Sequence, residues 1–151
     1  MDRYKFLILG VLAVSITGCS TVKYLPENFD STSGISEPTE GRAGVYVYQA
    51  KTGVIGSFLD VDFEIKGYPT VPINTGEYAY FEVLPGKSEY KLAGGILPKF
   101  EPVEFEAGHN YFFRAYLVGF HDASYLVGNQ PEIDAVKQSI VSGRYELNTV
   151  D

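Results

Sequence analysis

From Ala43 onward, apolar and polar residues alternate with a period of two, which is the pattern of β-strands that have one buried face. The clearest example is the stretch 59–66, in which four apolar residues alternate with four charged ones: Leu59, Val61, Phe63 and Ile65 against Asp60, Asp62, Glu64 and Lys66. A strand of this kind has one dry face and one wet face. The pattern therefore predicts a sheet that packs a single face against a core.

Shorter stretches predict the remaining strands. They cover 45–48, 71–73, 78–83, 88–92, 101–106, 111–118 and 125–127. The strand 71–73 contains Pro72, which cannot donate a ladder hydrogen bond and therefore belongs at a sheet edge. The strand 111–118 is apolar at nearly every position, so we expect it at the centre of a sheet. Pro85 and Gly86 between two strands fit a type II turn.

The C-terminal part changes from strand spacing to helix spacing. Pro131 is suited to open a helix, because the N–H that it lacks has no helical acceptor there. Ile133, Val136 and Ile140 then follow the helical period, and Gly143 is a plausible stop. We therefore expect a mainly β fold: an antiparallel β-sandwich of seven to eight short strands with one short C-terminal amphipathic helix.

The N-terminal part predicts a secreted and anchored protein. Arg3 and Lys5 precede the apolar run 6–16, as in a signal peptide. A helix over this run would be about 16 Å long, roughly half of a bilayer core. The run is therefore too short to be a good transmembrane anchor.

The only cysteine of the chain, Cys19, is separated from the end of this run by two residues. The string Ile16, Thr17, Gly18 and Cys19 resembles the lipobox of bacterial lipoproteins. That resemblance implies cleavage before Cys19, diacylglycerol on its thiol and an acyl chain on the new amine. Such a lipid group would anchor the protein to a membrane without further help. The covalent lipid is the one non-protein group expected, and we predict no other cofactor.

These observations divide the chain into three parts: a lipoprotein signal peptide at 1–18, the lipidated cysteine and a flexible tether at 19–42, and a β-sandwich domain at 43–151. The tether is rich in Ser, Thr, Glu, Pro and Gly. In Gram-negative lipoproteins, Asp after the cysteine tends to retain the protein at the inner membrane, and Ser20 stands here. We therefore expect the outer membrane, facing the periplasm, if the host is Gram-negative.

Composition and charge narrow the function further. The formal net charge is −7, which argues against nucleic acid as a partner, because phosphate binding needs clustered Lys and Arg. With a single cysteine, no disulfide can form within the chain, so its stability must come from a core.

Taken together, four segments of the part predicted to fold resemble a known family. They read "GRAGVYVYQAKTG", "FLDVDFEIKGYP", "GEYAYFEVLPGKSEYKL" and "FEAGHNYFFRAYLVG" and cover roughly 41–119. The chain is similar to bacterial lipoproteins that carry the domain-of-unknown-function family numbered 2846. Its "PG" hairpin is shared with transthyretin-like and carboxypeptidase-regulatory-like sandwiches. Lys66 and His109 depart from the family pattern, in which Asp and Lys are common. The resemblance implies a fold and a location but no activity.

Candidate metal and catalytic residues are few. Asp60, Asp62 and Glu64 lie on alternate strand positions about 6.7 Å apart, too far apart to chelate one calcium ion. We interpret them as a solvated strand face.

The two histidines, His109 and His121, are interpreted as an exposed turn residue and a polar loop residue. His121 and Asp122 have Ser124 nearby, but these spacings do not assemble a triad. The sequence predicts no catalytic residue and no metal site.

The most distinctive aromatic residues are Tyr46, Tyr48, Tyr78 and Tyr80. They lie on strands with two apolar faces, so we expect one face in the core and the other covered by the helix. An exposed tyrosine face is the alternative, and it would suit a partner or a cell-wall glycan.

Arg114 interrupts the most apolar strand and needs a partner if it is buried; Glu82 and Glu104 are the candidates.

Together these observations predict a lipid-anchored, non-catalytic binding or scaffolding module of the cell envelope. Its expected partners are the membrane, through the anchor, and an envelope protein. The alternative is a glycan-binding module that uses exposed tyrosines.

Overall fold

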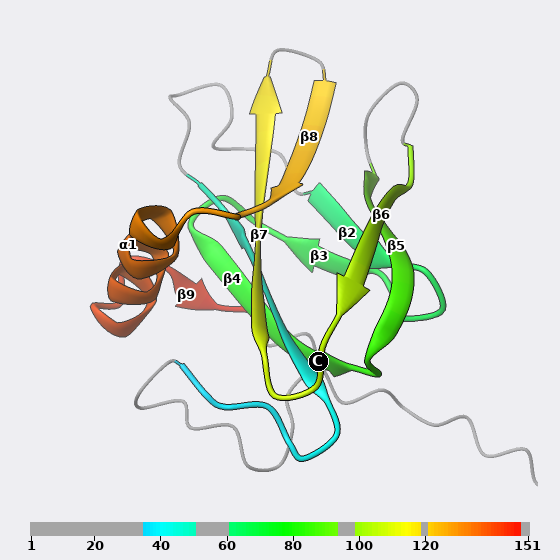
Figure 1. The fold of residues 1–151 in the computed structure, drawn as a ribbon. Helices are drawn as coiled ribbons and strands as arrows, with labels where there is room; N and C mark the ends of the chain where they lie inside the picture. Colours follow the sequence, from blue (N-terminus) through cyan, green and yellow to red (C-terminus); the bar gives the residue numbers. More distant parts are fainter. Residues whose placement is uncertain (1–34, 51–60, 94–98, 119–120, 149–151) are drawn as a thin grey trace, which may run out of the picture.

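The structure is a computed structural model that describes residues 35–50, 61–93, 99–118 and 121–148 (Figure 1). The predicted signal peptide, the lipobox and Cys19 lie outside the described residues, as does Asp60. The elements in chain order are β1 (Ala43–Gln49), β2 (Val61–Ile65), β3 (Val71–Ile73), β4 (Glu77–Val83), β5 (Gly86–Ala93), β6 (Glu101–Phe105), β7 (Asn110–Val118), β8 (His121–Leu126), α1 (Gln130–Val141) and β9 (Glu146–Leu147). Within these ranges no helix has the length and apolar character needed to cross a membrane.

The strands form two sheets that face each other, with the helix on the far side of one of them (Figure 1). The larger sheet has the order β8-β7-β1-β4-β9, and the smaller sheet has the order β3-β2-β5-β6. The predicted mainly β sandwich with a C-terminal helix is confirmed. The smaller sheet is antiparallel throughout, whereas the larger sheet is mixed, because β1 pairs with β7 and β4 pairs with β9 in parallel.

The centre of the larger sheet is β1, and the prediction that the strand at 111–118 is central was wrong. All seven residues of β1 are buried, and the strand has β4 on one side and β7 on the other. A strand covered on both faces has no position for a solvated side chain, which explains why β1 carries no charged residue and only one strongly polar one, Gln49, at its end. Pro72 lies on β3 at the edge of the smaller sheet, as predicted.

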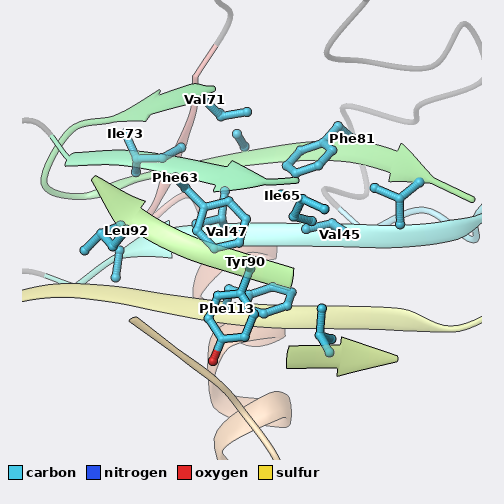
Figure 2. Packing of buried hydrophobic residues seen from close by; sticks show 14 of the residues in the cluster. Val45, Val47, Phe63, Ile65, Val71, Ile73, Phe81, Tyr90, Leu92 and Phe113 are labelled. Atoms are coloured by element: carbon cyan, nitrogen blue, oxygen red, sulfur yellow. The ribbon is translucent and has the colours of Figure 1, made fainter. Parts of the chain in front are cut away.

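The main core lies between the two sheets, and Figure 2 shows its packing. Val45 and Val47 of β1 point into it, together with Phe63 and Ile65 of β2. Phe113 of β7 lies at its middle, because its ring centroid is 5.0 Å from that of Phe63 and 4.7 Å from that of Tyr90. Within the described part of the stretch 59–66, β2 therefore alternates between this core and the solvent side, as predicted.

A second apolar layer covers the outer face of the larger sheet. It contains the four tyrosines named above, Phe112, Val127 and two residues of α1, Val136 and Ile140. Helix α1 begins after the N-cap Asn129, has Pro131 in its first turn, and is followed by Gly143 with a positive φ of 72°. The helix signals in the sequence are thus confirmed, and the helix is held by Val136 and Ile140.

Residues 35–42 also lie on this outer layer, although the sequence predicts a tether there. The backbone N–H of Ser36 donates to the hydroxyl of Tyr46 at 2.7 Å, and the side-chain amide of Asn110 donates to the Ser36 carbonyl at 2.8 Å. Thr39 donates from both its backbone N–H and its hydroxyl to Glu82. The folded domain therefore begins by Ile35 rather than at Ala43, because the buried tyrosine hydroxyl needs hydrogen-bond partners.

Candidate functional site

Arg114 is a charged residue placed on an otherwise apolar strand. It lies on β7, directly beside Tyr48 of β1 and beside Tyr125 of β8. Alternate residues of a strand point to opposite faces, so Arg114 shares the outer face of the sheet with Phe112. This places its guanidinium at the contact between the sheet and α1.

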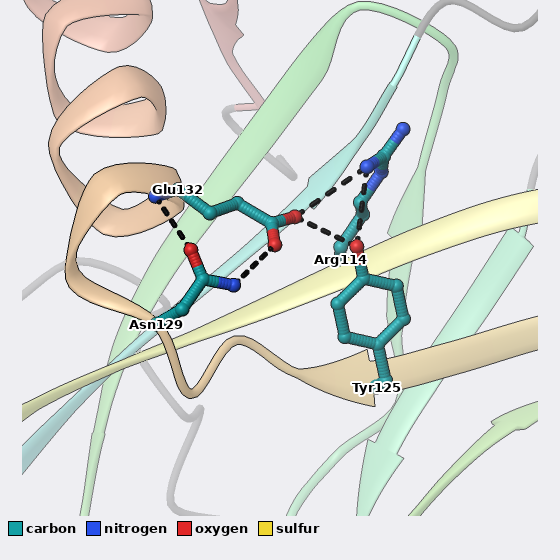
Figure 3. A network of polar contacts seen from close by, with 4 residues as sticks. All are labelled: Arg114, Tyr125, Asn129 and Glu132. Carbon is teal, nitrogen blue, oxygen red and sulfur yellow. Dashed lines mark hydrogen bonds and ion pairs between the residues drawn. The ribbon is translucent and has the colours of Figure 1, made fainter.

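A polar network joins Arg114 to the start of the helix (Figure 3). The hydroxyl of Tyr125 donates to Oε1 of Glu132 at 2.7 Å and accepts from Nη1 of Arg114 at 3.1 Å. Nη1 of Arg114 also lies 3.4 Å from the same carboxylate oxygen. The network fixes the first turn of α1 against strands β7 and β8.

Asn129 completes this network at the helix N-terminus. Its Oδ1 accepts from the backbone N–H of Glu132 at 2.9 Å, and its side-chain amide donates to Oε2 of Glu132 at 3.0 Å. An N-cap side chain of this kind satisfies one of the backbone donors that a helix start leaves open. Glu132 is therefore oriented from both sides and held in one position next to Arg114.

The protonation states follow from these contacts. The hydrogen bond from Tyr125, followed by the bonds from Asn129 and Arg114, holds the pKa of Glu132 below its ordinary value despite some desolvation. Desolvation opposes the charge on Arg114, but its bond to Tyr125 and the neighbouring phenols outweigh that effect, so its pKa is raised. Both groups are therefore ionised near neutral pH, and the site carries one positive and one negative charge.

A cavity of about 180 Å³ opens next to this ion pair, between α1 and the outer face of the larger sheet. Its lining includes Tyr48, Arg114, Glu132, Ser139 and Tyr145. The rings of Tyr48 and Tyr145 meet with their centroids 5.3 Å apart. Burial raises the pKa of both tyrosines, so their phenols stay protonated and can donate hydrogen bonds.

A second hollow, of about 390 Å³, lies on the other side of the molecule and is lined by Lys66, Lys87, Ser88 and Glu89. Lys66 already forms an exposed ion pair with Glu89. Lys66 and Lys91 also lie over the ring of Phe100, at 5.8 and 4.5 Å from its centroid. Because Lys66 and Glu89 already pair with each other in this hollow, we take the cavity beside α1 as the candidate site.

The partners expected for Arg114 were wrong. Glu82 lies opposite Gly44 near the start of β1, whereas Arg114 lies beside Tyr48 near its end. Glu82 instead accepts from Thr39 and Tyr80. Glu104 is an exposed residue of β6 in the other sheet. The partner found is Glu132, from an element whose position on the sheet could not be read from strand spacing.

The four tyrosines are covered, as the favoured interpretation predicts. Tyr46, Tyr48, Tyr78 and Tyr80 are between 0% and 4% exposed. Tyr46 stacks on Phe112 with centroids 4.9 Å apart, and Tyr48 contacts Tyr145 after the helix. The alternative of an exposed tyrosine row was wrong, because α1 and residues 35–42 close over it. A glycan therefore has no aromatic platform at these four residues.

The remaining candidates are the two histidines and the acidic residues of β2. His109 is exposed in the turn before β7, as predicted. His121 begins strand β8 and is not in a loop, which corrects its predicted location. Asp62 is exposed on the outer face of β2, and Glu64 pairs with Lys91 at 2.9 Å. Among the described residues, no group of His, Cys, Asp and Glu could hold a metal ion.

Sequence reasoning missed the role of Glu132 and Tyr145. A signal for Glu132 was available, because Asn129 and Glu132 have the three-residue spacing of an N-cap residue and its reciprocal partner. No signal was available for Tyr145, since only the path of the chain after α1 brings it to Tyr48.

Comparison with protein-family models finds no match, and a search of curated proteins finds no significant relative. The resemblance to the lipoprotein family therefore stays a prediction.

Proposed function

We propose that this protein is a lipid-anchored lipoprotein of the bacterial cell envelope whose folded domain is a non-catalytic binding or scaffolding module. The observation that carries the proposal is the apolar run 6–16, whose last residue begins the string Ile16-Thr17-Gly18-Cys19. A single cysteine just after a short signal-like run offers its thiol as the site of lipid attachment. With Ser20 next to it, the outer membrane is the destination in a Gram-negative host.

The dimensions of the chain suit a domain held close to a membrane. The sixteen residues of chain from Cys19 to Ile35 can span at most roughly 55 Å when fully extended. The domain is thus limited to contacts near the membrane surface, which favours partners that belong to the envelope itself. A core built from two packed layers gives it stability without a disulfide.

The non-catalytic part of the proposal rests on the polar groups of the described residues. Arg114 and Glu132 are strongly ionised partners, and neither has a pKa suited to exchanging protons near neutral pH. The phenols of Tyr48 and Tyr145 are held in their protonated form. Such groups donate and accept hydrogen bonds without reacting, which is the behaviour of a binding site.

The experiment is cross-linking in intact cells, followed by mass spectrometry of the captured protein. The matched control is Cys19→Ala, which keeps the domain unchanged and removes the anchor. We expect one reproducible envelope partner that is lost in the control. Absence of any partner above background, with the wild-type protein present at normal abundance, would contradict a scaffolding role.

A further inference from the structure

The guanidinium of Arg114 has more donors than its neighbours use. Nη1 donates to both Tyr125 and Glu132 (Figure 3), whereas the described residues supply no acceptor for the other guanidinium nitrogens. Nε is buried and has no acceptor among the described residues. An arginine with unused donors beside a cavity is in position to bind an anionic group, and arginine is well suited to carboxylates.

The cavity supplies two further donors. Tyr48 and Tyr145 both line it, and neither phenol hydroxyl makes a hydrogen bond to another residue in the described part of the chain. Tyr48 is only 3% exposed, so its ring is fixed in the layer beneath the helix. Two phenols and one guanidinium therefore line the same cavity.

Size and charge restrict the ligand. A volume of about 180 Å³ corresponds to roughly six water-sized groups, at about 30 Å³ each. Glu132 lies against Arg114, so the ion pair is close to neutral, and the Glu132 carboxylate repels a dianion such as phosphate about twice as strongly as a monoanion. A monovalent carboxylate can use the free donors of Arg114 without a large net penalty.

We infer that the cavity between α1 and the larger sheet binds a small monocarboxylate, held by Arg114, Tyr48 and Tyr145. The rings of the two tyrosines and Val136 form an apolar wall for a short hydrocarbon body. This inference deepens the proposed binding function and rests on it. Titration of the purified protein tests the cavity without a membrane or an envelope partner, so the two proposals can fail separately.

The probe is sodium acetate, added to the full chain purified in detergent, with sodium chloride used to hold the ionic strength constant. Binding is followed by the backbone amide NMR signals of Ser139 and Tyr145. We expect saturable shifts with a dissociation constant of about 1 mM or somewhat weaker, which is within reach of a ligand of this size.

Three variants make the test specific. Arg114→Gln should weaken acetate binding about tenfold or more, because a charged hydrogen bond is lost. Tyr48→Phe keeps the ring and removes only the hydroxyl, so we expect its acetate affinity to fall by a few-fold. This variant keeps the test informative even if Arg114→Gln folds poorly. Arg42→Gln removes the same charge from an exposed position before β1 and should bind as the wild type does.

Selective, saturable acetate shifts that the two cavity variants weaken would support the inference. Shifts that do not saturate would overturn the inference. So would an acetate affinity that is the same in the wild type, in Tyr48→Phe and in Arg114→Gln. A stronger response to phosphate than to acetate would overturn the assignment of a monocarboxylate.

Discussion

Replacing Gly44 by alanine should disturb the place where the larger sheet and the N-terminal segment meet. Gly44 lies on β1 between Glu82 of β4 and Asn110 of β7. A Cβ atom at this position would lie 1.9 Å from Oδ1 of Asn110 and 2.9 Å from the ring of Tyr80. Both neighbours are constrained, because Asn110 donates to the Ser36 carbonyl and Tyr80 donates to Glu82.

The expected cost can be worked from these contacts. Overpacking in a close-packed layer costs about 1–3 kcal/mol. Displacing the Asn110 amide from Ser36 adds about 1 kcal/mol for the lost hydrogen bond. The reduced entropy of the unfolded chain returns about 0.4–1 kcal/mol when glycine becomes alanine. We therefore expect Gly44→Ala to lower the free energy of unfolding by about 2 kcal/mol.

The assay is urea unfolding of the purified protein, followed by far-ultraviolet circular dichroism. The midpoint should fall while the slope against urea stays constant, since the unfolded surface is unchanged. The matched control is Gly128→Ala, because a Cβ there would meet no atom within 4 Å and the backbone has no positive φ. That control should change stability by no more than about 0.5 kcal/mol.

A second variant identifies the contact responsible. Asn110→Ala removes the closest atom, so its added cost should be smaller in the Gly44→Ala background than in the wild type. Equal stability of Gly44→Ala and Gly128→Ala would refute the reasoning. Full additivity of Gly44→Ala and Asn110→Ala would refute the part assigned to Asn110.

Three further predictions concern the helix. Ile140→Ala should lower the free energy of unfolding by about 2–5 kcal/mol, because Ile140 is buried against the tyrosine layer. Val141→Ala, at the exposed neighbouring position, should leave it nearly unchanged, and urea unfolding compares the two variants. The folded-state pKa of Glu132 lies below its ordinary value of 4.5, so its stabilising contribution is present above about pH 4.5 and is lost as the pH falls through the folded-state pKa. Thermal unfolding across this range should therefore show a weaker pH dependence in Glu132→Gln than in the wild type, and equal slopes would contradict the network. Gly143→Ala should lower the free energy of unfolding by about 1 kcal/mol, because a φ of 72° is strained for alanine. An unchanged melting temperature would contradict this.

Much of the fold could be predicted from the sequence, because buried positions recur with the period of a strand or a helix. The alternation at 59–66 predicted the face of β2 that meets the core, and the two apolar faces of 45–48 predicted a strand covered on both sides. The helix was visible through Pro131 and Gly143, since both residues have backbone preferences that act locally. Such backbone preferences do not depend on residues that are far away in the chain.

The order of strands in the larger sheet was less accessible. The parallel pairing of β1 with β7 joins strands that are far apart in the chain, and no hairpin turn fixes it. This pairing determines which residues surround Arg114, so the choice of Glu82 or Glu104 as its partner was wrong. The site at Arg114 depends on where α1 docks, and hydrophobic spacing specifies only the face of the helix that is buried.

The most direct test of the proposed lipoprotein is the intact mass of the protein extracted from membranes of its host. The account predicts a mature chain that begins at Cys19 and carries a diacylglycerol group, with or without a further acyl chain on the amine. Cys19→Ala should abolish both the cleavage and the added mass. A chain that retains residues 1–18, or a Cys19 without lipid in a membrane-associated protein, would contradict the account.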